Sequence, residues 1–325
     1  MLQFATILAK ERPAINRAVD SLTNSLPEHV RPAAAYALGS GGKRLRPLLV
    51  VLMARAMGCQ DDGVYALGAT AELFHVATLL HDDILDNADL RRGRESTHRR
   101  FGVPCTLLTA DAMFSRAFQA LAETGDPRCV SCLCRAVIGT VDGEIMEIDN
   151  QGRTNGLEDY YKIIEGKTAY LLRASCELGA IKANADEARI QAACDYGYNL
   201  GMAFQIVDDA LDFAPSEKTG KPEGGDILEG KFTPPICYYM ESLDPESRNA
   251  FRSKFAALSF SEEERAAIVE AVRANGFQER TLRLADTFLD KASNALDRIA
   301  PESSQGVRAV SVLREAVSFV RNRAS

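Results

Sequence analysis

No stretch of the sequence reaches the roughly 20 consecutive apolar residues that span a bilayer, so we expect no transmembrane helix. The opening residues, MLQFATILAKERPAIN, lack a basic region ahead of a long apolar core, and we expect no signal peptide. Basic residues are not in excess, because the net charge is −7, and this disfavours a general nucleic-acid-binding surface. These absences predict a cytoplasmic protein. Peripheral membrane contact is expected only if the product is a lipid that must be released.

Histidine does not accompany the cysteines. Eight cysteines are present, and most stand singly in apolar runs, where a free thiol behaves as a small hydrophobe. Only Cys129, Cys132 and Cys134 lie close together, and no histidine or second cysteine pair has the spacing that would complete a zinc site. We therefore expect packed or half-exposed thiols in a reducing compartment rather than a metal centre.

The sequence also lacks the alternating pattern of strands, and we expect no sheet. Apolar residues recur at steps of three and four through long segments rich in alanine and leucine, which predicts an all-α helical bundle. Asp186 is expected to cap the helix that follows it, and Ser261 with Glu264 forms a capping-box pattern. The predicted helices are 45–57, 64–86, 104–122, 128–149, 157–183, 188–213, 261–275, 277–299 and 303–321.

Three segments rich in Gly, Pro, Lys or Arg interrupt the predicted helices, at 39–43, 87–104 and 214–233. Domain linkers have similar compositions. Each of these segments, however, adjoins an aspartate cluster or carries paired basic residues. We therefore expect functional loops within one large domain that spans residues 1–325.

Two aspartate clusters of the same pattern end long apolar segments: HDDILD at 81–86 and DDALD at 208–212. In each cluster the first and last carboxylates are four residues apart and share one helix face. A single cluster of this kind could be a solvated helix end. Carboxylates at a helix C-terminus, however, meet the negative end of the helix dipole, so two such placements suggest a cation that offsets the cost. Hard oxygen ligands with open positions suit Mg²⁺.

Basic residues stand near these clusters. The segment GGKRLRP at 41–47 places a flexible turn before a helix, and the exposed N–H groups of a helix start favour phosphate. A lone lysine is usually a solvated surface charge. Together, however, these residues predict a ligand with a diphosphate head and an apolar body that lies between helices. The remaining candidates are Arg91, Arg92, Lys167, Thr168, Lys221 and Lys231.

Over nearly its whole length the chain resembles the trans-isoprenyl diphosphate synthases, or polyprenyl synthetases. The segments that carry the resemblance are GGKRLRP (41–47), LLHDDILDNADLRRG (79–93), GKT (166–168), FQIVDDALD (204–212) and TGKPEGGDILEGKFT (219–233). The resemblance implies the isoprenoid synthase fold with a central active-site cavity, and a homodimer. It also implies an Mg²⁺-dependent (E)-prenyltransferase that condenses isopentenyl diphosphate with an allylic diphosphate, similar to octaprenyl and other polyprenyl diphosphate synthases.

The same resemblance implies roles for individual residues. The principal Mg²⁺ ligands would be Asp82, Asp86 and Asp208, supported by Asp83, Asp209 and Asp212. The allylic diphosphate would be held by Arg91, Lys167, Thr168, Gln205, Lys221 and Lys231. The isopentenyl diphosphate would be held by Lys43, Arg46, His75 and Arg92. Asp82, Asp86, Asp208, Lys167 and Lys221 are the predicted catalytic residues.

Product length is expected to depend on the residues about one turn before Asp82. In the family, bulky aromatic residues there stop growth at short products. Ala77 and Thr78 are small, so we expect a medium or long product, beyond C20. A deeper floor could be formed by Phe74, Met113, Phe114 and Phe118, although each of these side chains could simply pack the core.

Three other functions are consistent with parts of the sequence. A class I terpene cyclase shares the first DDxxD but normally carries a different second metal motif and does not need GGKRLRP. A non-catalytic subunit of a heteromeric synthase would tend to lose the aspartates, and all six are present. A helical di-iron protein would use Glu-x-x-His pairs such as Glu72 with His75 and Glu95 with His98, but no further pair of helical glutamates is evident.

Overall fold

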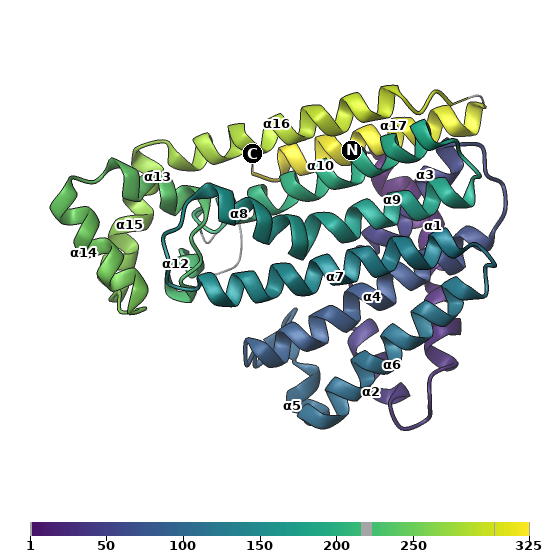
Figure 1. The fold of residues 1–325 in the computed structure, drawn as a ribbon, viewed down its shortest axis with the longest axis horizontal. Helices are drawn as coiled ribbons and strands as arrows, with labels where there is room; N and C mark the ends of the chain where they lie inside the picture. Colours follow the sequence, from purple (N-terminus) through teal and green to yellow (C-terminus); the bar gives the residue numbers. More distant parts are fainter. Residues whose placement is uncertain (1, 216–222, 302, 325) are drawn as a thin grey trace. The chain divides into compact units, whose positions relative to one another are not determined.

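Long helices make up almost all of the structure, a computed structural model that describes residues 2–215, 223–301 and 303–324 (Figure 1). Contacts divide the chain into two units. Unit 1 comprises residues 1–135, 171–194 and 296–315, and unit 2 comprises 136–170, 195–295 and 316–325.

Most helices begin and end within a few residues of the positions that the apolar periodicity predicts. The predicted segments correspond to α3 (Leu45–Ala56), α4 (Gly63–Leu85), α6 (Val103–Ala122), α7 (Pro127–Asn150), α8 (Leu157–Ile164), α9 (Tyr170–Lys182), α10 (Glu187–Leu211), α15 (Glu262–Ala274), α16 (Phe277–Asp297) and α17 (Ser304–Arg321). Both predicted caps are present. Ser261 and Glu264 form a reciprocal capping box, and Asp186 Oδ1 accepts the Arg189 N–H at 2.9 Å.

Other elements were not predicted. The expectation of no strands was wrong, because β1 (Leu90–Arg91) and β2 (Arg94–Glu95) form a short antiparallel pair within 87–104. Strands of two residues are too short to show an alternating pattern. The same segment contains α5 (Thr97–Phe101), and 214–233 contains α12 (Gly225–Glu229), so neither is entirely loop. The remaining helices are α1 (Leu2–Asn24), α2 (Arg31–Leu38), α13 (Pro234–Ser242), α14 (Pro245–Ala256) and the 3₁₀ turn η2 (Asn322–Ala324).

Helix α4 is the central element of unit 1 and packs against α1, α3 and α6. Its side chains are apolar on most faces, and Leu73 and Phe74 are fully buried, which is the pattern of a core helix. By length and composition alone α4 could cross a membrane, contrary to the expectation from the sequence. However, 67% of its most apolar window is buried within the protein. This burial accounts for its composition.

Unit 2 has an apolar core beneath α13, α14 and α15, which lie together in Figure 1. Phe213, Phe251 and Phe255 are buried in this core. The predicted helix 157–183 is interrupted by a π-helical turn, η1 (Glu165–Ala169), between α8 and α9. A Cβ on Gly166 would lie 2.5 Å from the Gly139 carbonyl oxygen, so the turn can touch α7 only because residue 166 lacks a side chain.

Candidate active site

The first aspartate cluster lies at the C-terminal end of α4, in unit 1. Asp83 is buried, and Arg91 Nε donates a hydrogen bond of 2.6 Å to its Oδ1 atom. A second guanidinium nitrogen of Arg91 contacts the same oxygen. Asp82 is half-buried, whereas Asp86, the C-cap residue, is exposed. The outer carboxylates therefore have access to solvent, and the middle carboxylate is committed to Arg91.

Two glycines before α3 allow a second arginine to approach the backbone. Gly41 and Gly42 have φ angles of 89° and 140°, in the region that favours glycine. A Cβ on Gly42 would lie 2.8 Å from Arg92 Nη1, so a side chain there would displace this guanidinium. Arg92 Nη1 contacts the Gly41 carbonyl oxygen. Lys43, in the same turn, is exposed.

Positive charge is concentrated around Arg46 and His75. Burial lowers the pKa of Arg46 to about 10, and its Nε atom is buried with no hydrogen-bond partner among residues 2–215, 223–301 and 303–324. Burial, followed by the charges of Arg46 and three further arginines, lowers the pKa of His75 well below its ordinary value. Glu72 offsets only part of this charge, because it pairs with Arg44 at 2.7 Å. A buried cation with an unsatisfied donor favours an anionic ligand.

The second aspartate cluster lies at the end of α10, in unit 2. Asp208 Oδ1 lies 2.6 Å from Arg323 Nη2 in the C-terminal turn η2. Asp212 Oδ2 accepts the backbone N–H of Asp226 at 3.0 Å. The side chain of Asp226 lies near Asp212, and its Oδ2 atom is buried without a hydrogen-bond partner in the part of the chain that the structure describes. Burial, then the charge of Asp212, raises the pKa of Asp226 well above its ordinary value.

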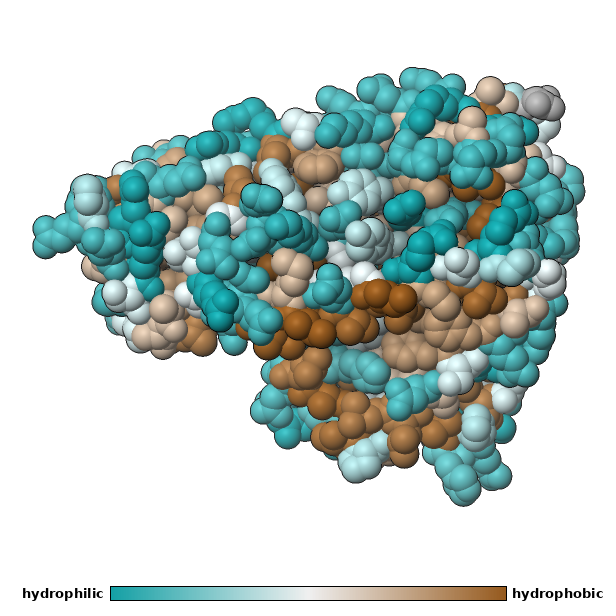
Figure 2. Space-filling view, viewed as in Figure 1, coloured by the Kyte–Doolittle hydropathy of each residue, from teal (hydrophilic) through white to brown (hydrophobic). Residues whose placement is uncertain are grey.

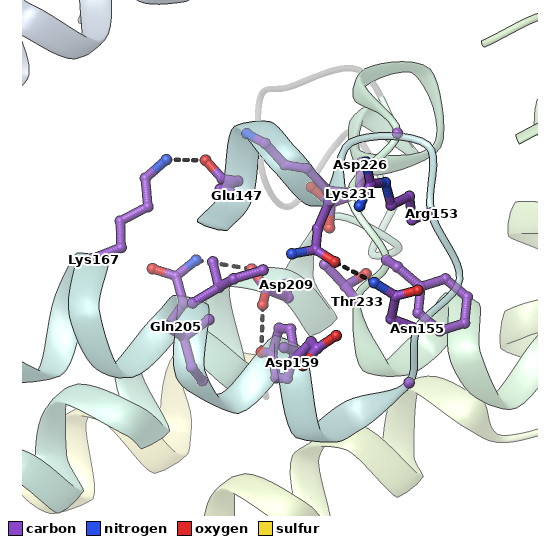
Figure 3. A pocket seen from close by; sticks show the side chains of 17 residues that line it. Glu147, Arg153, Asn155, Asp159, Lys167, Gln205, Asp209, Asp226, Lys231 and Thr233 are labelled. Carbon is purple, nitrogen blue, oxygen red and sulfur yellow. Dashed lines mark hydrogen bonds and ion pairs between the residues drawn. The ribbon is translucent and has the colours of Figure 1, made fainter. Parts of the chain in front are cut away.

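Both oxygens of Asp209 have hydrogen-bond partners within the protein. Tyr160 Oη donates to Oδ2 at 2.5 Å. Gln205 Nε2 donates to Oδ1 at 2.8 Å, as Figure 3 shows. The Gln205 carbonyl oxygen in turn accepts the Thr168 hydroxyl at 2.9 Å. Asp209 is only 8% exposed. The middle carboxylate of this cluster is thus buried and committed, as Asp83 is in the first.

Two lysines line a pocket of about 130 Å³ beside Asp209 (Figure 3). Lys167 Nζ lies 3.1 Å from Glu144 Oε2 and also contacts Glu147. Lys231 Nζ lies 2.6 Å from Glu229 Oε2. Burial disfavours both ammonium charges, but the neighbouring carboxylates outweigh it and raise both pKa values. Both lysines are therefore cations at neutral pH.

Residues 27–272 match the model of the polyprenyl synthetase family. The chain belongs to the polyprenyl synthetase family. It is 35% identical over 320 residues to heptaprenyl diphosphate synthase component 2 of Geobacillus stearothermophilus, which covers 97% of this chain and 95% of that protein. It is 30% identical over 311 residues to a geranylgeranyl diphosphate synthase of Sulfolobus acidocaldarius, with 93% and 94% covered. These relatives are named for products of different length.

A solved structure agrees with the family. The polyprenyl synthase of Caulobacter crescentus CB15, complexed with calcium and isoprenyl diphosphate, superposes with a TM-score of 0.90 at 33% identity, covering 99% of this chain and 98% of that one. The prediction of an all-α protein with the isoprenoid synthase fold is confirmed. The family also establishes that this polyprenyl synthetase is a prenyltransferase.

The donor set of the synthetase fits a hard divalent cation. Asp208 already accepts a positive group, the Arg323 guanidinium, and Asp226 Oδ2 is a buried oxygen that has no hydrogen-bond partner among the described residues. Within residues 2–215, 223–301 and 303–324, no group of three or more His, Cys, Asp or Glu side chains could hold a metal ion by itself. Mg²⁺ is usually held by one or two carboxylates together with water and substrate phosphate. The outer aspartates match that role better than Asp83 and Asp209 do.

Sequence reasoning missed several residues of this site. Four residues contact predicted site residues or line the pocket beside them, but were not predicted to bind metal or diphosphate: Glu144, Glu147, Tyr160 and Asp226. Asp226 stands within the segment TGKPEGGDILEGKFT, which was the one available signal. Lys221, a predicted catalytic residue, lies outside the described residues.

The predicted floor of the product tunnel forms one aromatic cluster in unit 1. The centre of the Phe74 ring on α4 lies 4.9 Å from that of Phe114 and 5.0 Å from that of Phe118, both on α6. Met113 and Ala77 are fully buried nearby on the same two helices. The small Ala77 side chain and the aromatic cluster therefore lie on α4, which carries Asp82, and on α6.

The side chains of the alternative di-iron and cysteine sites have other surroundings in the structure. Glu72 of the alternative di-iron pair forms an ion pair with Arg44, and Glu95 is exposed on β2.

Of the clustered cysteines, Cys129 and Cys132 are buried and Cys134 is half-buried, as expected for packed thiols. The Cys132 thiol donates to the Ala174 carbonyl oxygen at 3.6 Å, and burial raises its pKa well above the ordinary value.

Proposed function

We propose that this synthetase condenses isopentenyl diphosphate with an allylic diphosphate in an Mg²⁺-dependent reaction and makes an all-trans product longer than C20. One observation carries the proposal. In both aspartate clusters the middle carboxylate is buried and held by protein donors, while the outer carboxylates are more exposed. This arrangement leaves Asp82, Asp86 and Asp208 as the carboxylates best suited to a metal–diphosphate ligand.

The charged residues of each unit would bind a diphosphate. In unit 1, Arg46 and His75, with Lys43 and Arg92, would hold isopentenyl diphosphate, because this region has uncompensated positive charge and an unsatisfied Arg46 donor. In unit 2, Lys167 and Lys231, with Thr168 and Gln205, would hold the allylic diphosphate.

The reaction would break the allylic C–O bond with release of diphosphate and form a carbon–carbon bond to isopentenyl diphosphate. The condensed cation would then lose a proton to the released diphosphate. When bound, Mg²⁺ would neutralise charge on the departing diphosphate. Lys167 and Lys231 would donate charge-assisted hydrogen bonds to the same leaving group. The apolar side chains of α4 and α6 would exclude water, which would otherwise convert the allylic cation to an alcohol.

The proposed product length rests on Ala77. Its side chain is fully buried and small, and it lies one turn before Asp82 on α4. A growing chain that passes Ala77 would next meet the ring cluster of Phe74, Phe114 and Phe118. We place the end of the tunnel at this cluster.

We further propose that the enzyme is a homodimer that uses an apolar stripe on α7. Ile138, Val141, Ile145 and Ile148 recur at steps of three and four and are 52% to 70% exposed. Figure 2 shows apolar side chains along this helix. Burying such a stripe against a second copy would remove it from water. Sedimentation of the wild type and of Ile145→Glu tests this, and a wild type that sediments as a monomer would contradict it.

A product assay tests the enzymatic proposal. The protein is incubated with Mg²⁺, labelled isopentenyl diphosphate and farnesyl diphosphate, and the dephosphorylated products are separated by chain length. A ladder that ends in one product beyond C20, and that EDTA abolishes, is expected. A folded protein that elongates no allylic primer would refute the proposal.

A further inference from the structure

Tyr160 is a buried residue that the proposed reaction does not use directly. It lies on α8, is 5% exposed, and its hydroxyl lies 2.5 Å from Asp209 Oδ2. The hydroxyl therefore donates a hydrogen bond to this carboxyl group.

The other Asp209 oxygen, Oδ1, accepts a hydrogen bond from Gln205. Thr168 donates its hydroxyl to Gln205 Oε1 at 2.9 Å, which fixes the amide so that Nε2 faces Asp209 at 2.8 Å. Asp209 thus receives one donor from α8 and one from its own helix, α10. These two bonds fix the position of the carboxylate and the direction in which the last turn of α10 presents its neighbours.

The last turn of α10 needs such an anchor. It carries the carboxyl groups of Asp208, Asp209 and Asp212, which lie close together at the negative end of the helix dipole. Asp208 pairs with Arg323 in the turn η2, whereas Asp209 accepts a hydrogen bond from Tyr160 on α8. Loss of the bond from Tyr160 would let the turn and the Asp208 carboxylate change position.

We propose that Tyr160 is a positioning residue: by fixing Asp209, its hydroxyl orients the outer carboxylates of the second cluster for a divalent cation. This inference rests on the proposed metal role of Asp208. Partners of this kind, which hold the residues around a metal, typically change metal affinity by roughly 10- to 100-fold when removed.

Tyr160→Phe tests the inference, because it removes the hydroxyl and keeps the ring. Mn²⁺ alone is the probe, since carboxylates that suit Mg²⁺ also suit Mn²⁺, and electron paramagnetic resonance measures the free ion. The dissociation constant for Mn²⁺ is expected to rise roughly tenfold or more. The Mg²⁺ concentration for half-maximal elongation should rise in parallel, while kcat at saturating Mg²⁺ stays near the wild-type value. Tyr161→Phe, the same change one residue later, should alter neither.

The two proposals fail in different ways. A wild type that binds Mn²⁺ but does not elongate would refute the enzymatic proposal, and the Mn²⁺ comparison would still decide the role of Tyr160. A folded Tyr160→Phe variant with unchanged Mn²⁺ affinity would overturn the inference, even if its melting temperature fell. If that variant does not fold, Gln205→Met removes the other donor to Asp209 and is expected to weaken Mn²⁺ binding. Unchanged affinity there would overturn the inference as well, as would a wild type that binds no Mn²⁺.

Discussion

Arg323 Nη2 lies 2.6 Å from Asp208 Oδ1, so a guanidinium contacts the carboxylate that we propose as an Mg²⁺ ligand. The same guanidinium lies 4.6 Å from the centre of the Phe204 ring, which holds it over the end of α10. If Asp208 binds the metal as proposed, a divalent cation would have to displace the Arg323 guanidinium. The affinity of the metal site would then depend on the C-terminal turn η2.

Arg323→Ala should lower the Mg²⁺ concentration needed for half-maximal elongation. A partly exposed ion pair contributes up to about 1 kcal/mol, which corresponds to a shift of about two- to fivefold. Titration of activity with Mg²⁺ measures the shift. Arg321→Ala is the matched control, because Arg321 pairs with Asp286 and Asp290 instead of the cluster. A higher Mg²⁺ requirement in Arg323→Ala would show that the guanidinium assists binding instead of competing.

Asp82→Ala should lower turnover by at least about a hundredfold, because it removes one of the outer carboxylates proposed to hold the metal. The helical circular dichroism spectrum should be unchanged, since Asp82 is half-buried at the end of α4. Asp89→Ala provides the control: Asp89 is exposed in the next loop and pairs with Arg99. Near-normal turnover in Asp82→Ala would remove this residue from the metal site.

Ala77→Phe should shorten the product, because the new ring would fill the path between α4 and α6 before the aromatic cluster is reached. Phe114→Ala should have the opposite effect, since it removes a ring that lies 4.9 Å from Phe74. Chromatography of the dephosphorylated products measures both changes. If neither substitution alters the product distribution, the chain grows along another path.

The sequence predicted the helices of this protein best where one apolar period runs for many residues. Helices α4 and α10 are examples, and the spacing of Asp82 and Asp86 on one face follows directly from the 3.6-residue turn. Helix α1 was missed, because Pro13 interrupts its pattern. The π turn η1 has no periodic signature that separates it from the helices on either side.

The candidate site was predictable where function required a local motif. The partners of those motif residues were not, because they come from distant parts of the chain. Tyr160 reaches Asp209 across 49 positions, and its neighbour Tyr161 is chemically identical in the sequence. Only packing decides which of the two tyrosines faces the carboxylate. For the same reason the sequence could not show that Asp83 and Asp209 are committed to protein donors.

Asp209 should also make the stability of the metal-free protein depend on pH. Burial raises the pKa of Asp209 from 3.8 to about 7, against the opposing effect of the hydrogen bonds from Tyr160 and Gln205. Between about pH 4 and pH 7 the folded protein therefore holds a proton that the unfolded chain has lost. Folded-state proton binding of this kind contributes stability at low pH, and the contribution is lost as the pH rises toward 7.

Asp209→Asn removes this titration, because an amide stays neutral at every pH in the range. The free energy of unfolding of the variant minus that of the wild type should therefore increase between pH 5 and pH 8, by about 1 to 3 kcal/mol. Urea unfolding in EDTA measures both proteins without bound metal. Taking the difference between the proteins cancels the titration of groups that do not interact with Asp209. A difference that stays constant from pH 5 to pH 8 would mean that Asp209 is already ionised in the folded protein, stabilised by its two donors.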